Sequence, residues 1–599
     1  MNAPITTTTV NRDVAELPAV KKFCSHDGAQ LAYRHWSAVR PGNSRKAVVL
    51  FHRGHEHGGR ISHLVDELLM PECDFFAWDM RGLGVSEGTR GYAEDIGELI
   101  RDIDAFVRHI TSEYQIATSD ISLVGQSVGA VLVAAYVHDY APDIRAMVLA
   151  APAFKVNLFV PFARQGLALW QQLRGTFFVN SYVRPEMLTR DSERVASYKN
   201  DPLITRPIAS NILLQLYETG ERLVEDAAAI QVPTLVFVSG DDWVVDKDPQ
   251  YRFAARLGGA DSRLLELPGF RHDTLGEAER ELAIAPLREF LQQQYAYRKA
   301  PKELRRADRN GYSAAKYHQL SQQPGRFAKL KWRGVKVAVR AAAKLSDGYK
   351  LGLNTGFDSG ATLDYVYRNK ASGKTFIGRW IDRLYLDNIG WQGIRQRKVH
   401  LEQLIQEAID QLGHQQNSAR IMDIAAGHGR YLLDAIEPVR NSIGHLQLRD
   451  FSEANVEACQ QQLEQRGLTS VAEVLQADAF DYRLLVGLAK QPNLVVVSGL
   501  YELFSDNCLV ERSLAGISDL IEEGGYLIYT NQPWHPQQEL IARGLTSHRG
   551  NEPWVMRCRS QAEMDQLVTT AGFTKQAQLT DQWGIFSVSI ARKVTVDAA

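Results

Sequence analysis

Five residues in the first quarter of the chain read Gly125-Gln126-Ser127-Val128-Gly129, and an apolar run lies on each side of them. Residues 121–124 (Ile-Ser-Leu-Val) have the composition of a buried strand, and residues 130–135 (Ala-Val-Leu-Val-Ala-Ala) fit a buried helix. A serine between glycines at a strand-to-helix junction sits on a sharp, strained turn that lifts its hydroxyl above the sheet edge. We therefore predict that Ser127 is a nucleophile.

A nucleophilic serine on such a turn requires an acid and then a histidine later in the chain. The apolar, β-branched run 232–238 predicts a strand, and the loop after it holds two adjacent acids. An acid in that loop is well placed to orient an imidazole. We predict Asp242 for this role, ahead of Asp241 and then Asp246.

The general base is predicted from the next strand, residues 263–267, which leads through a short turn to His272. This histidine would take the serine proton and return it to the leaving group. The oxyanion hole needs two backbone N–H groups, one from Val128 and one from the loop after an earlier strand at 47–51. Gly54 is the candidate donor in that loop.

Three histidines in the same loop, His52, His55 and His57, suggest a metal site as an alternative. Histidine is a common zinc ligand, but a site needs three or four ligands in suitable geometry. Because no cluster of acids or cysteines accompanies these histidines, we predict no bound metal.

Several motifs of this half resemble those of a known family. Residues 52–60 (His-Arg-Gly-His-Glu-His-Gly-Gly-Arg) resemble the His-Gly-x-Gly-Glu-His-x-x-Arg loop of the monoglyceride lipase and lysophospholipase branch of the α/β-hydrolases, a branch of the serine aminopeptidase type. Residues 79–86 resemble its Asp-x-Arg-Gly-x-Gly-x-Ser motif, and residues 188–191 and 198–203 resemble parts of its cap.

This resemblance covers residues 1–295 and implies an α/β-hydrolase fold with a helical cap at about 154–225. It also implies cleavage of a carboxylic ester in a lysophospholipid-like or monoacylglycerol-like lipid, with no cofactor. Arg53 and His55 replace two glycines of the family loop, so a charged side chain is expected beside the oxyanion hole.

The composition changes after the hydrolase. Residues 298–350 contain 15 Lys or Arg against 3 Asp or Glu, and residues 326–344 mix basic with apolar side chains. We interpret residues 296–345 as a basic linker. A solvated linker with interdomain salt bridges and a segment that lies on an anionic membrane both fit this composition.

The whole chain has the composition of an ordinary folded protein. It has 599 residues, is 45% hydrophobic and 23% charged, and carries a net charge of −2, so we expect no nucleic-acid partner. Five scattered cysteines fit a reducing compartment. Because the start lacks the pattern of a signal peptide and no apolar run reaches about 18 residues, we expect a cytoplasmic protein, with peripheral contact at the inner membrane face if residues 326–344 bind lipid.

The second half has its own glycine-rich turn. A short apolar run ends at Asp423, and Ala425-Ala426-Gly427-His428-Gly429 follows before a helical pattern. This resembles the first motif of class I S-adenosylmethionine-dependent methyltransferases, in which small residues let the backbone approach the cofactor. The resemblance implies that Asp423, Ala425, Gly427 and Gly429 bind S-adenosyl-L-methionine, although Ala425 stands where the family usually has glycine.

Two further acids follow in the order that this family requires. Asp450, at the end of the next predicted strand, would accept hydrogen bonds from the ribose hydroxyls. Asp478 and Ala479 resemble the motif that holds adenine. Strands and helices alternate over residues 346–599, so we predict a doubly wound, Rossmann-like sheet with an N-terminal cover at about 346–415.

Alternatives remain for this half. A nicotinamide-binding domain and a degenerate copy without cofactor are the rivals. Tyr365, Tyr367 and Arg395 are candidates for contact with cofactor or acceptor, and His535 is either an acceptor base or a structural residue. The methyl acceptor is not indicated.

The sequence thus predicts a serine ester hydrolase fused to a methyltransferase, possessing two α/β domains and acting in lipid modification. The alternative is a membrane-associated regulatory or scaffold protein in which one domain is catalytically inactive.

Overall fold

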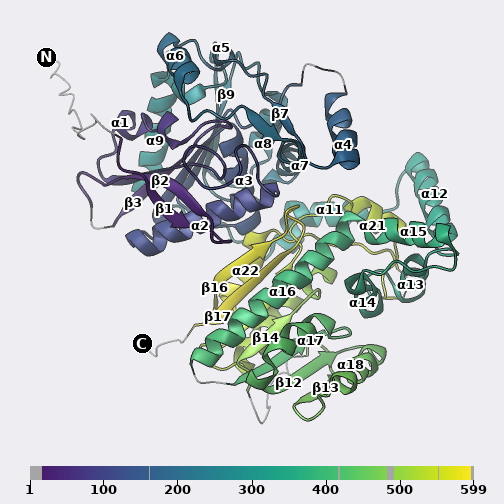
Figure 1. The fold of residues 1–599 in the computed structure, drawn as a ribbon. Helices are drawn as coiled ribbons and strands as arrows, with labels where there is room; N and C mark the ends of the chain where they lie inside the picture. The colour runs from purple at the N-terminus through teal and green to yellow at the C-terminus, as the bar shows by residue number, and fades with distance from the viewer. Residues whose placement is uncertain are drawn as a thin grey trace. The chain divides into compact units, whose positions relative to one another are not determined.

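The computed structural model describes residues 17–42, 44–158, 160, 162–415, 418–481, 491–550 and 552–594. The chain divides into two compact units, Met1–Lys302 and Glu303–Ala599. Figure 1 shows a strand-rich centre with helices around it in each unit.

The first unit is built on an eight-stranded sheet in the order β1-β2-β4-β3-β5-β6-β9-β10. Strand β2 pairs antiparallel with β1 and β4, and all the other neighbours are parallel. The strands are β1 (Lys21–Cys24), β2 (Gln30–Trp36), β3 (Lys46–Phe51), β4 (Cys73–Trp78), β5 (Ile121–Gln126), β6 (Ala146–Ala150), β9 (Thr234–Ser239) and β10 (Ser262–Leu267).

Helices cover both faces of this sheet because its central strands are apolar on both sides. Val49 and Leu123 pack into one core with α2 (Ile96–Tyr114), α3 (Val128–Tyr140) and α8 (Asp248–Arg256). Their neighbours Val48 and Val124 point the other way, into a second core with α1 (Leu64–Glu67) and α9 (Glu281–Ala296). This is the arrangement of a doubly wound sheet, so the predicted fold class is confirmed.

A cap is inserted between β6 and β9. It contains α4 (Ala163–Arg174), α5 (Pro185–Leu188), α6 (Ser192–Asn200), α7 (Ser210–Glu225) and the antiparallel pair β7 (Phe178–Asn180) and β8 (Pro207–Ala209). These elements fall within the predicted range 154–225. The short β7–β8 pair is an addition to the helical cap that the sequence predicts.

The second unit is built on a seven-stranded sheet in the order β13-β12-β11-β14-β15-β17-β16. Its first five strands are parallel and β17 is antiparallel to both neighbours. The strands are β11 (Ala419–Ile424), β12 (Ile443–Asp450), β13 (Ala472–Gln476), β14 (Leu494–Val497), β15 (Tyr526–Asn531), β16 (Phe573–Thr580) and β17 (Ser587–Lys593).

Helices again lie on both faces. Ile421 packs with α16 (Ile389–His414), α17 (Arg430–Ile436) and α18 (Glu453–Arg466), whereas Met422 faces α20 (Asn507–Leu520) and α22 (Gln561–Thr570). The cover consists of α13 (Asp347–Thr355), α14 (Gly360–Arg368), α15 (Phe376–Leu386) and the 26-residue α16, and α21 (Gln538–Gly544) follows β15. The predicted Rossmann-like sheet is present.

The segment interpreted as a linker is folded. The two units divide after Lys302, and residues 296–345 contain α10 (Ala307–Asn310), α11 (Tyr312–Ser321) and α12 (Arg326–Ala342). These helices belong to the second unit, where a buried polar network holds the part of the segment before α12. Arg557 donates to Ser313 Oγ of α11 (2.9 Å), and Asn507 donates to the backbone oxygen of Arg305 (3.0 Å). Because buried arginines must be paired, this network fixes the segment in place.

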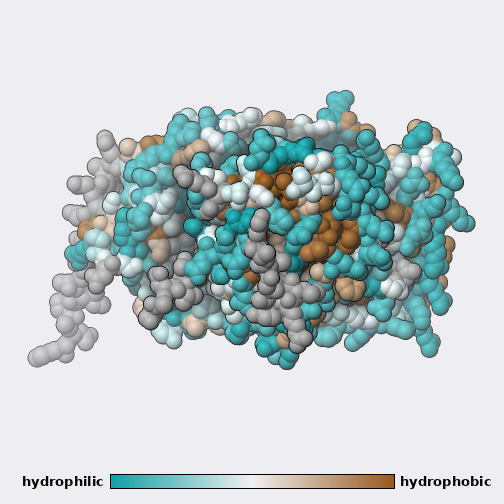
Figure 2. All heavy atoms as spheres, turned by 90° about the horizontal axis from the view of Figure 1, so that it is seen from below, coloured by the Kyte–Doolittle hydropathy of each residue, from teal (hydrophilic) through white to brown (hydrophobic). Residues whose placement is uncertain are grey.

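Figure 2 shows one face on which hydrophilic residues dominate and apolar side chains gather in one area. Among the helices that the structure describes, none is both long and apolar enough to cross a membrane.

Candidate active sites

Ser127 lies on the turn between β5 and α3 and has φ 57° and ψ −116°. A residue other than glycine in such a conformation costs about 1–3 kcal/mol, which the surrounding structure must supply. The two flanking positions must be glycine because a side chain there would collide with neighbouring backbone atoms. A Cβ on Gly125 would lie 2.8 Å from Ala130 Cα, and one on Gly129 would lie 2.5 Å from the backbone oxygen of His52. Close packing of the turn against its own helix and against the end of β3 therefore holds the serine in its strained conformation.

The structure brings together the three side chains predicted to act with this turn. His272 Nε2 lies 2.7 Å from Ser127 Oγ, and His272 Nδ1 lies 2.7 Å from Asp242 Oδ2. All three side chains are buried or nearly so. They come from the carboxyl ends of β5, β9 and β10, which meet at one edge of the sheet.

The geometry also distinguishes between the neighbouring acids. Asp242 Oδ1 accepts hydrogen bonds from the backbone N–H groups of Val244 (2.8 Å) and Val245 (3.1 Å), which fixes the carboxylate toward the imidazole. The side chain of Asp241 is exposed, and Asp246 pairs with Lys155 at 2.7 Å. Of the three candidates, Asp242 is the one bonded to His272.

The loop after β3 approaches the start of α3. A Cβ on Gly54 would lie 3.0 Å from Val128 Cγ2, and both residues line the same cavity as Ser127 and His272. Because Gly54 has no side chain, its backbone can come close to the elbow, where an oxyanion donor is needed.

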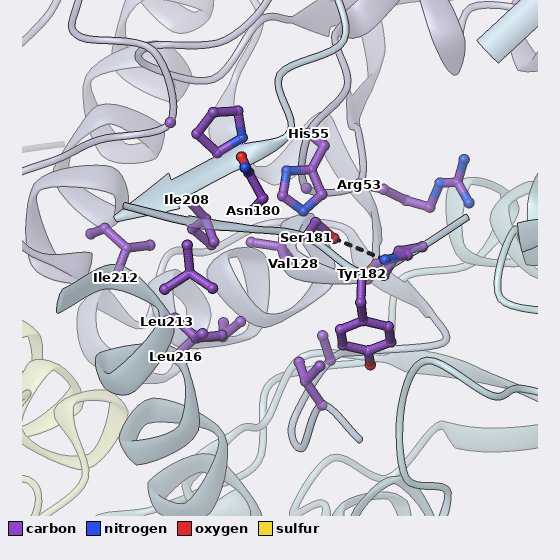
Figure 3. A pocket seen from close by; sticks show the side chains of 18 of the residues that line it. Arg53, His55, Val128, Asn180, Ser181, Tyr182, Ile208, Ile212, Leu213 and Leu216 are labelled. Carbon is purple, nitrogen blue, oxygen red and sulfur yellow. Dashed lines mark hydrogen bonds between the residues drawn. The ribbon is translucent and has the colours of Figure 1, made fainter. Parts of the chain in front are cut away.

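Arg53 does not leave an unbalanced charge in this loop. Its guanidinium donates to Glu56 (2.5 and 3.1 Å) and lies 3.4 Å from Asp273. Burial alone would lower the pKa of Arg53, but the carboxylates of Asp273 and Glu56 raise it above its usual value. Figure 3 shows the side chain directed away from Ile212 and Leu213 of the cavity wall.

The three histidines of the loop have separate partners. His52 Nε2 accepts from the Met80 N–H (3.0 Å), His55 Nδ1 contacts the Thr205 backbone oxygen (2.6 Å), and His57 Nε2 contacts Asp201 (3.0 Å). His55 has φ 72°, a conformation that favours the glycine found there in the family. Burial lowers the pKa of His55, so its imidazole is neutral near pH 7.

A cavity of about 580 Å³ opens above Ser127. Figure 3 shows how apolar side chains of β8 and α7 line it, with Val128 at the elbow and Tyr182 on the opposite wall. Its cap-derived apolar lining includes Leu158, Leu167, Trp170, Val179, Ile208, Ile212, Leu213 and Leu216. The volume lies in the range usual for small-molecule sites, about 300–1,000 Å³.

The predicted turn of the second unit joins β11 to α17. Ala425, Gly427 and Gly429 all have positive φ, at 61°, 60° and 67°. Gly427 and Gly429 adopt this conformation freely, whereas the methyl group of Ala425 makes it strained. Gly427 N–H donates to Asp450 Oδ2 (2.8 Å), so the turn and the acid at the end of β12 are held together.

Asp423 is fully buried at the end of β11. Tyr431 donates its hydroxyl hydrogen to Asp423 Oδ1 (2.5 Å), and Oδ2 has no hydrogen-bond partner among the described residues. Burial raises the pKa of the Asp423 carboxyl to about 7, although the Tyr431 hydrogen bond opposes this shift. An unpartnered buried oxygen beside a small-residue turn fits a site that receives a polar or cationic ligand.

Asp450 and Asp478 lie at the carboxyl ends of neighbouring strands. Asp450 Oδ1 accepts from the Ser452 N–H (2.9 Å) and from Asn455 (3.0 Å). Asp478 is exposed and accepts from the Phe480 N–H (2.9 Å), with the partly buried Ala479 between them. The predicted cofactor residues therefore follow one edge of the sheet in the order β11, β12, β13.

The cavity at the turn is only about 40 Å³. Helix α14 covers it, because Asp364 pairs with Arg430 and a Cβ on Gly360 would lie 2.7 Å from Asn455 Oδ1. Gly360, Leu363, Asp364 and Tyr367 of α14 form one wall of this cavity.

A larger cavity of about 400 Å³ adjoins the small one, since Leu363 and Arg397 line both. Its walls are aromatic and aliphatic, and its polar groups include Arg397, Glu502 and His535. Arg397 Nη1 lies 3.6 Å from Glu502 Oε1, while Glu502 Oε2 has no hydrogen-bond partner in the described part of the chain. Burial lowers the pKa of His535 to about 3, so this side chain is neutral at physiological pH.

Sequence reasoning missed two of these residues. Glu502 follows β14, and the only signal for it in the sequence is an acid shortly after that apolar strand. Arg397 lies within α16 and carries no local signal. Two residues suggested by the sequence lie elsewhere: Arg395 donates to the Leu386 backbone oxygen (2.8 Å), and Tyr365 donates to Asp382. Tyr367 lines the small cavity.

Comparisons with known proteins agree with this division. The family model described as "Putative methyltransferase" matches residues 287–593, just over half of the chain. The chain is 50% identical to "Uncharacterized protein YnbC" of Escherichia coli over 581 residues, 96% of this chain and 99% of that protein. The chain belongs to this methyltransferase family.

In this family member the first unit is a hydrolase. A second model, "Serine aminopeptidase, S33", matches residues 42–279. A monoacylglycerol lipase of Mycolicibacterium smegmatis is 28% identical over 44% of this chain and 92% of its own length, and phospholipase YtpA of Bacillus subtilis is 26% identical over 43% and 98%. A solved monoacylglycerol lipase of Paleococcus ferrophilus is 23% identical over 44% of this chain and 99% of its own, with a TM-score of 0.40. The chain thus joins an α/β-hydrolase to a methyltransferase-family unit.

Proposed function

We propose that the first unit is a serine hydrolase that cleaves a carboxylic ester in a monoacylglycerol-like or lysophospholipid-like molecule. The observation that carries this proposal is the hydrogen-bonded series Ser127, His272 and Asp242 beneath an apolar cavity. This arrangement supplies a nucleophile, a base and a group that orients the base.

In the proposed reaction, Ser127 Oγ attacks the ester carbonyl as its proton passes to His272 Nε2. The backbone N–H groups of Val128 and Gly54 would stabilise the negative charge that develops on the carbonyl oxygen. His272 then gives the proton to the departing alcohol. Water, activated by the same imidazole, hydrolyses the acyl-Ser127 ester and restores the free hydroxyl.

The lining of the cavity supports a lipid substrate. The aliphatic side chains of β8 and α7 suit an acyl chain, and each buried CH₂ contributes about 0.8 kcal/mol. Arg53 is balanced by Glu56 and Asp273 and is directed away from these residues, so a neutral ester meets no uncompensated charge there. The names of the two lipase relatives point to the same substrate class.

The test is activity-based labelling of the full chain with a fluorophosphonate probe, followed by assays with short-chain and long-chain monoacylglycerols and lysophospholipids. Wild type should be labelled and should release fatty acid, and Ser127→Ala should do neither. Ser122→Ala, which changes a buried serine of β5, the strand that leads to Ser127, is the matched control and should behave as wild type. Labelling that survives in Ser127→Ala would contradict the proposal.

We also propose that the second unit binds S-adenosyl-L-methionine and transfers its methyl group. Asp423, Ala425, Gly427 and Gly429 would hold the amino-acid and ribose parts, Asp450 the ribose hydroxyls, and Asp478 with Ala479 the adenine. When bound, the cofactor supplies an electrophilic methyl group for in-line displacement. The chain would contribute mainly orientation and exclusion of water.

Calorimetric titration of S-adenosylmethionine into the full chain tests this second proposal. Wild type should release heat, Asp423→Ala should bind at least about tenfold more weakly, and Asp410→Ala, an exposed acid on α16, should bind as wild type. The alternative is a regulatory unit that does not bind the cofactor. Absence of heat with wild type would favour that alternative.

A further inference from the structure

Helix α12 presents an apolar strip to solvent. Phe327, Leu330 and Val337 are 92%, 70% and 63% exposed, and they share one side of the helix at i, i+3 and i+10. The opposite side is used for packing, because Trp332 and Val339 are buried. The helix therefore has an apolar side toward the protein and a second apolar strip toward solvent.

Basic residues border this strip. The segment 326–344 has seven Lys or Arg and no Asp or Glu. Arg326, Lys329, Arg333, Lys336 and Arg340 lie along the helix beside the exposed apolar residues. Among the described residues none of these five forms an ion pair with an acid. This charge is therefore unbalanced locally, in contrast to that of Arg53.

Helix α15 repeats the pattern nearby. Phe376, Ile377, Trp380 and Leu384 are 77%, 61%, 59% and 53% exposed and follow one side of the helix. Its acid, Asp382, is fully buried in hydrogen bonds to Ser346 and Tyr365. The start of α15 packs against the chain just after α12, since a Cβ on Gly378 would lie 2.3 Å from the Leu345 backbone oxygen.

Both helices also form the wall of the 400 Å³ cavity. Ala338 of α12 and Leu384 of α15 line it and are exposed at the same time, so they lie at its opening. Figure 1 shows α12 and α15 at the same end of the second unit. We define the α12–α15 face as Phe327, Leu330, Val337, Phe376, Ile377, Trp380 and Leu384 with the basic residues of α12.

We propose that the α12–α15 face binds an anionic lipid bilayer and that the methyl acceptor is a lipid of this bilayer whose apolar part enters the 400 Å³ cavity. Exposed large apolar side chains bordered by unpaired Lys and Arg are the chemistry that suits the boundary between anionic headgroups and acyl chains. The aromatic and aliphatic cavity wall continues this surface inward toward Arg397 and Glu502.

The acceptor part of this inference rests on the proposed methyltransferase function. A bond forms between the methyl carbon and a nucleophilic oxygen or nitrogen of the lipid. The carbon–sulfur bond of S-adenosylmethionine breaks with its electron pair left on sulfur, and the proton of the nucleophile passes to water. The bilayer-binding part stands on the exposed face alone.

Vesicle flotation of the full chain tests binding. Wild type should float with phosphatidylcholine vesicles that contain phosphatidylglycerol at about one third and should float at least about tenfold less with phosphatidylcholine alone, because each basic residue near an anionic surface favours binding. Lys329→Glu with Lys336→Glu, and separately Phe327→Ser with Leu330→Ser, should reduce flotation on the anionic vesicles at least about tenfold.

Two control pairs make the test specific. Lys22→Glu with Arg40→Glu makes the same charge change on exposed residues of the first unit, and Leu169→Ser with Leu173→Ser removes exposed apolar side chains of α4. Both pairs should float as wild type. Equal flotation on the two kinds of vesicle, or loss of flotation in a control pair but not in the α12 pairs, would overturn the docking surface.

The acceptor is tested with S-adenosylmethionine labelled with tritium in its methyl group and vesicles of total bacterial lipid. Label should enter the organic phase with wild type and decrease at least about tenfold with the α12 pairs, which lie outside the cavity wall. If calorimetry shows that the cofactor binds but no label enters lipid, the lipid acceptor is wrong. If the cofactor itself fails to bind, the methyltransferase proposal is wrong. The flotation result then still decides whether the α12–α15 face binds the bilayer.

Discussion

The two candidate active sites differ in how complete they are in the polypeptide alone. At the first site Ser127, His272 and Asp242 already lie within hydrogen-bond distance of one another beneath a cavity of about 580 Å³. At the second site the turn encloses about 40 Å³, and Asp423 keeps one buried oxygen without a described partner.

The difference follows from the chemistry of each proposed reaction. Acyl transfer through serine uses protein side chains throughout, so the geometry can be fixed by packing before substrate arrives. Methyl transfer needs a donor that the chain does not contain, and its site can be finished only when the donor binds. A site fixed by side-chain contacts and a site completed by its donor are therefore expected in one chain.

The largest effect is expected from the adjacent acids of the first site. Asp242→Asn should lower kcat for ester hydrolysis about 10⁴-fold, because the amide no longer holds the imidazole in the required tautomer. Asp241→Asn, the matched control, should remain within about twofold since its side chain is exposed. Steady-state kinetics with a soluble ester give the comparison. Equal effects would mean that the acid has been assigned wrongly.

Next come the glycines of the two turns. Gly129→Ala should destabilise the first unit by about 2 kcal/mol or more, because its methyl group would meet the His52 backbone oxygen at 2.5 Å. Gly427→Ala should cost about 1 kcal/mol, since the methyl group has room and only the positive φ opposes it. Chemical denaturation followed by a probe in each unit measures both. A larger cost at Gly427 would contradict the picture of a fixed first site and an adaptable second site.

Cofactor affinity at the second site should depend on pH. The raised pKa of Asp423, about 7, means that the unliganded carboxyl is protonated below pH 7 and ionised above it. A cationic ligand prefers the ionised form, so affinity should rise as pH increases from 6 to 8, by at most about tenfold per pH unit, and then level off. Calorimetry across this range checks the slope.

Two variants identify the group that titrates. Asp423→Asn should remove the pH dependence. Tyr431→Phe should move it to higher pH, because the tyrosine hydrogen bond lowers the pKa of Asp423. A wild-type affinity that is flat over pH 6–8 would exclude Asp423 as the titrating group.

The smallest effect concerns backbone strain. Ala425→Gly should stabilise the second unit by up to about 1 kcal/mol, because glycine adopts φ 61° without the steric cost that alanine has. His55→Gly at the first site relieves similar strain but loses the hydrogen bond to Thr205, so it should be close to neutral. Thermal unfolding distinguishes the two, and a loss of stability in Ala425→Gly would be the opposite result.

The sequence predicted the parts of the structure that depend on local order. The elbow at Ser127, the loops after β9 and β10 and the turn at Asp423 follow from apolar runs that end in small or acidic residues. The edge strand β16 was not predicted, because Phe573–Thr580 is mostly polar and lies at the rim of the sheet.

Features that depend on distant residues were beyond the sequence. The basic segment was interpreted as a linker because its composition shifts to an excess of Lys and Arg, yet Arg557 and Asn507, about 200 residues later, bind its first part within the second unit. The same limit applies to Arg397 and Glu502, which meet only after α16 has packed on the sheet. Contacts between such distant residues do not appear in the hydrophobic pattern of either segment.

The buried network around Arg557 determines where the polypeptide can be cut for separate expression. A fragment that starts at residue 346 would lose Ser313 and the backbone oxygen of Arg305, leaving Arg557 and Asn507 with fewer partners in a dry interior. A fragment that starts at Glu303 would retain them. The shorter fragment should be recovered mainly as insoluble material and the longer one as soluble protein.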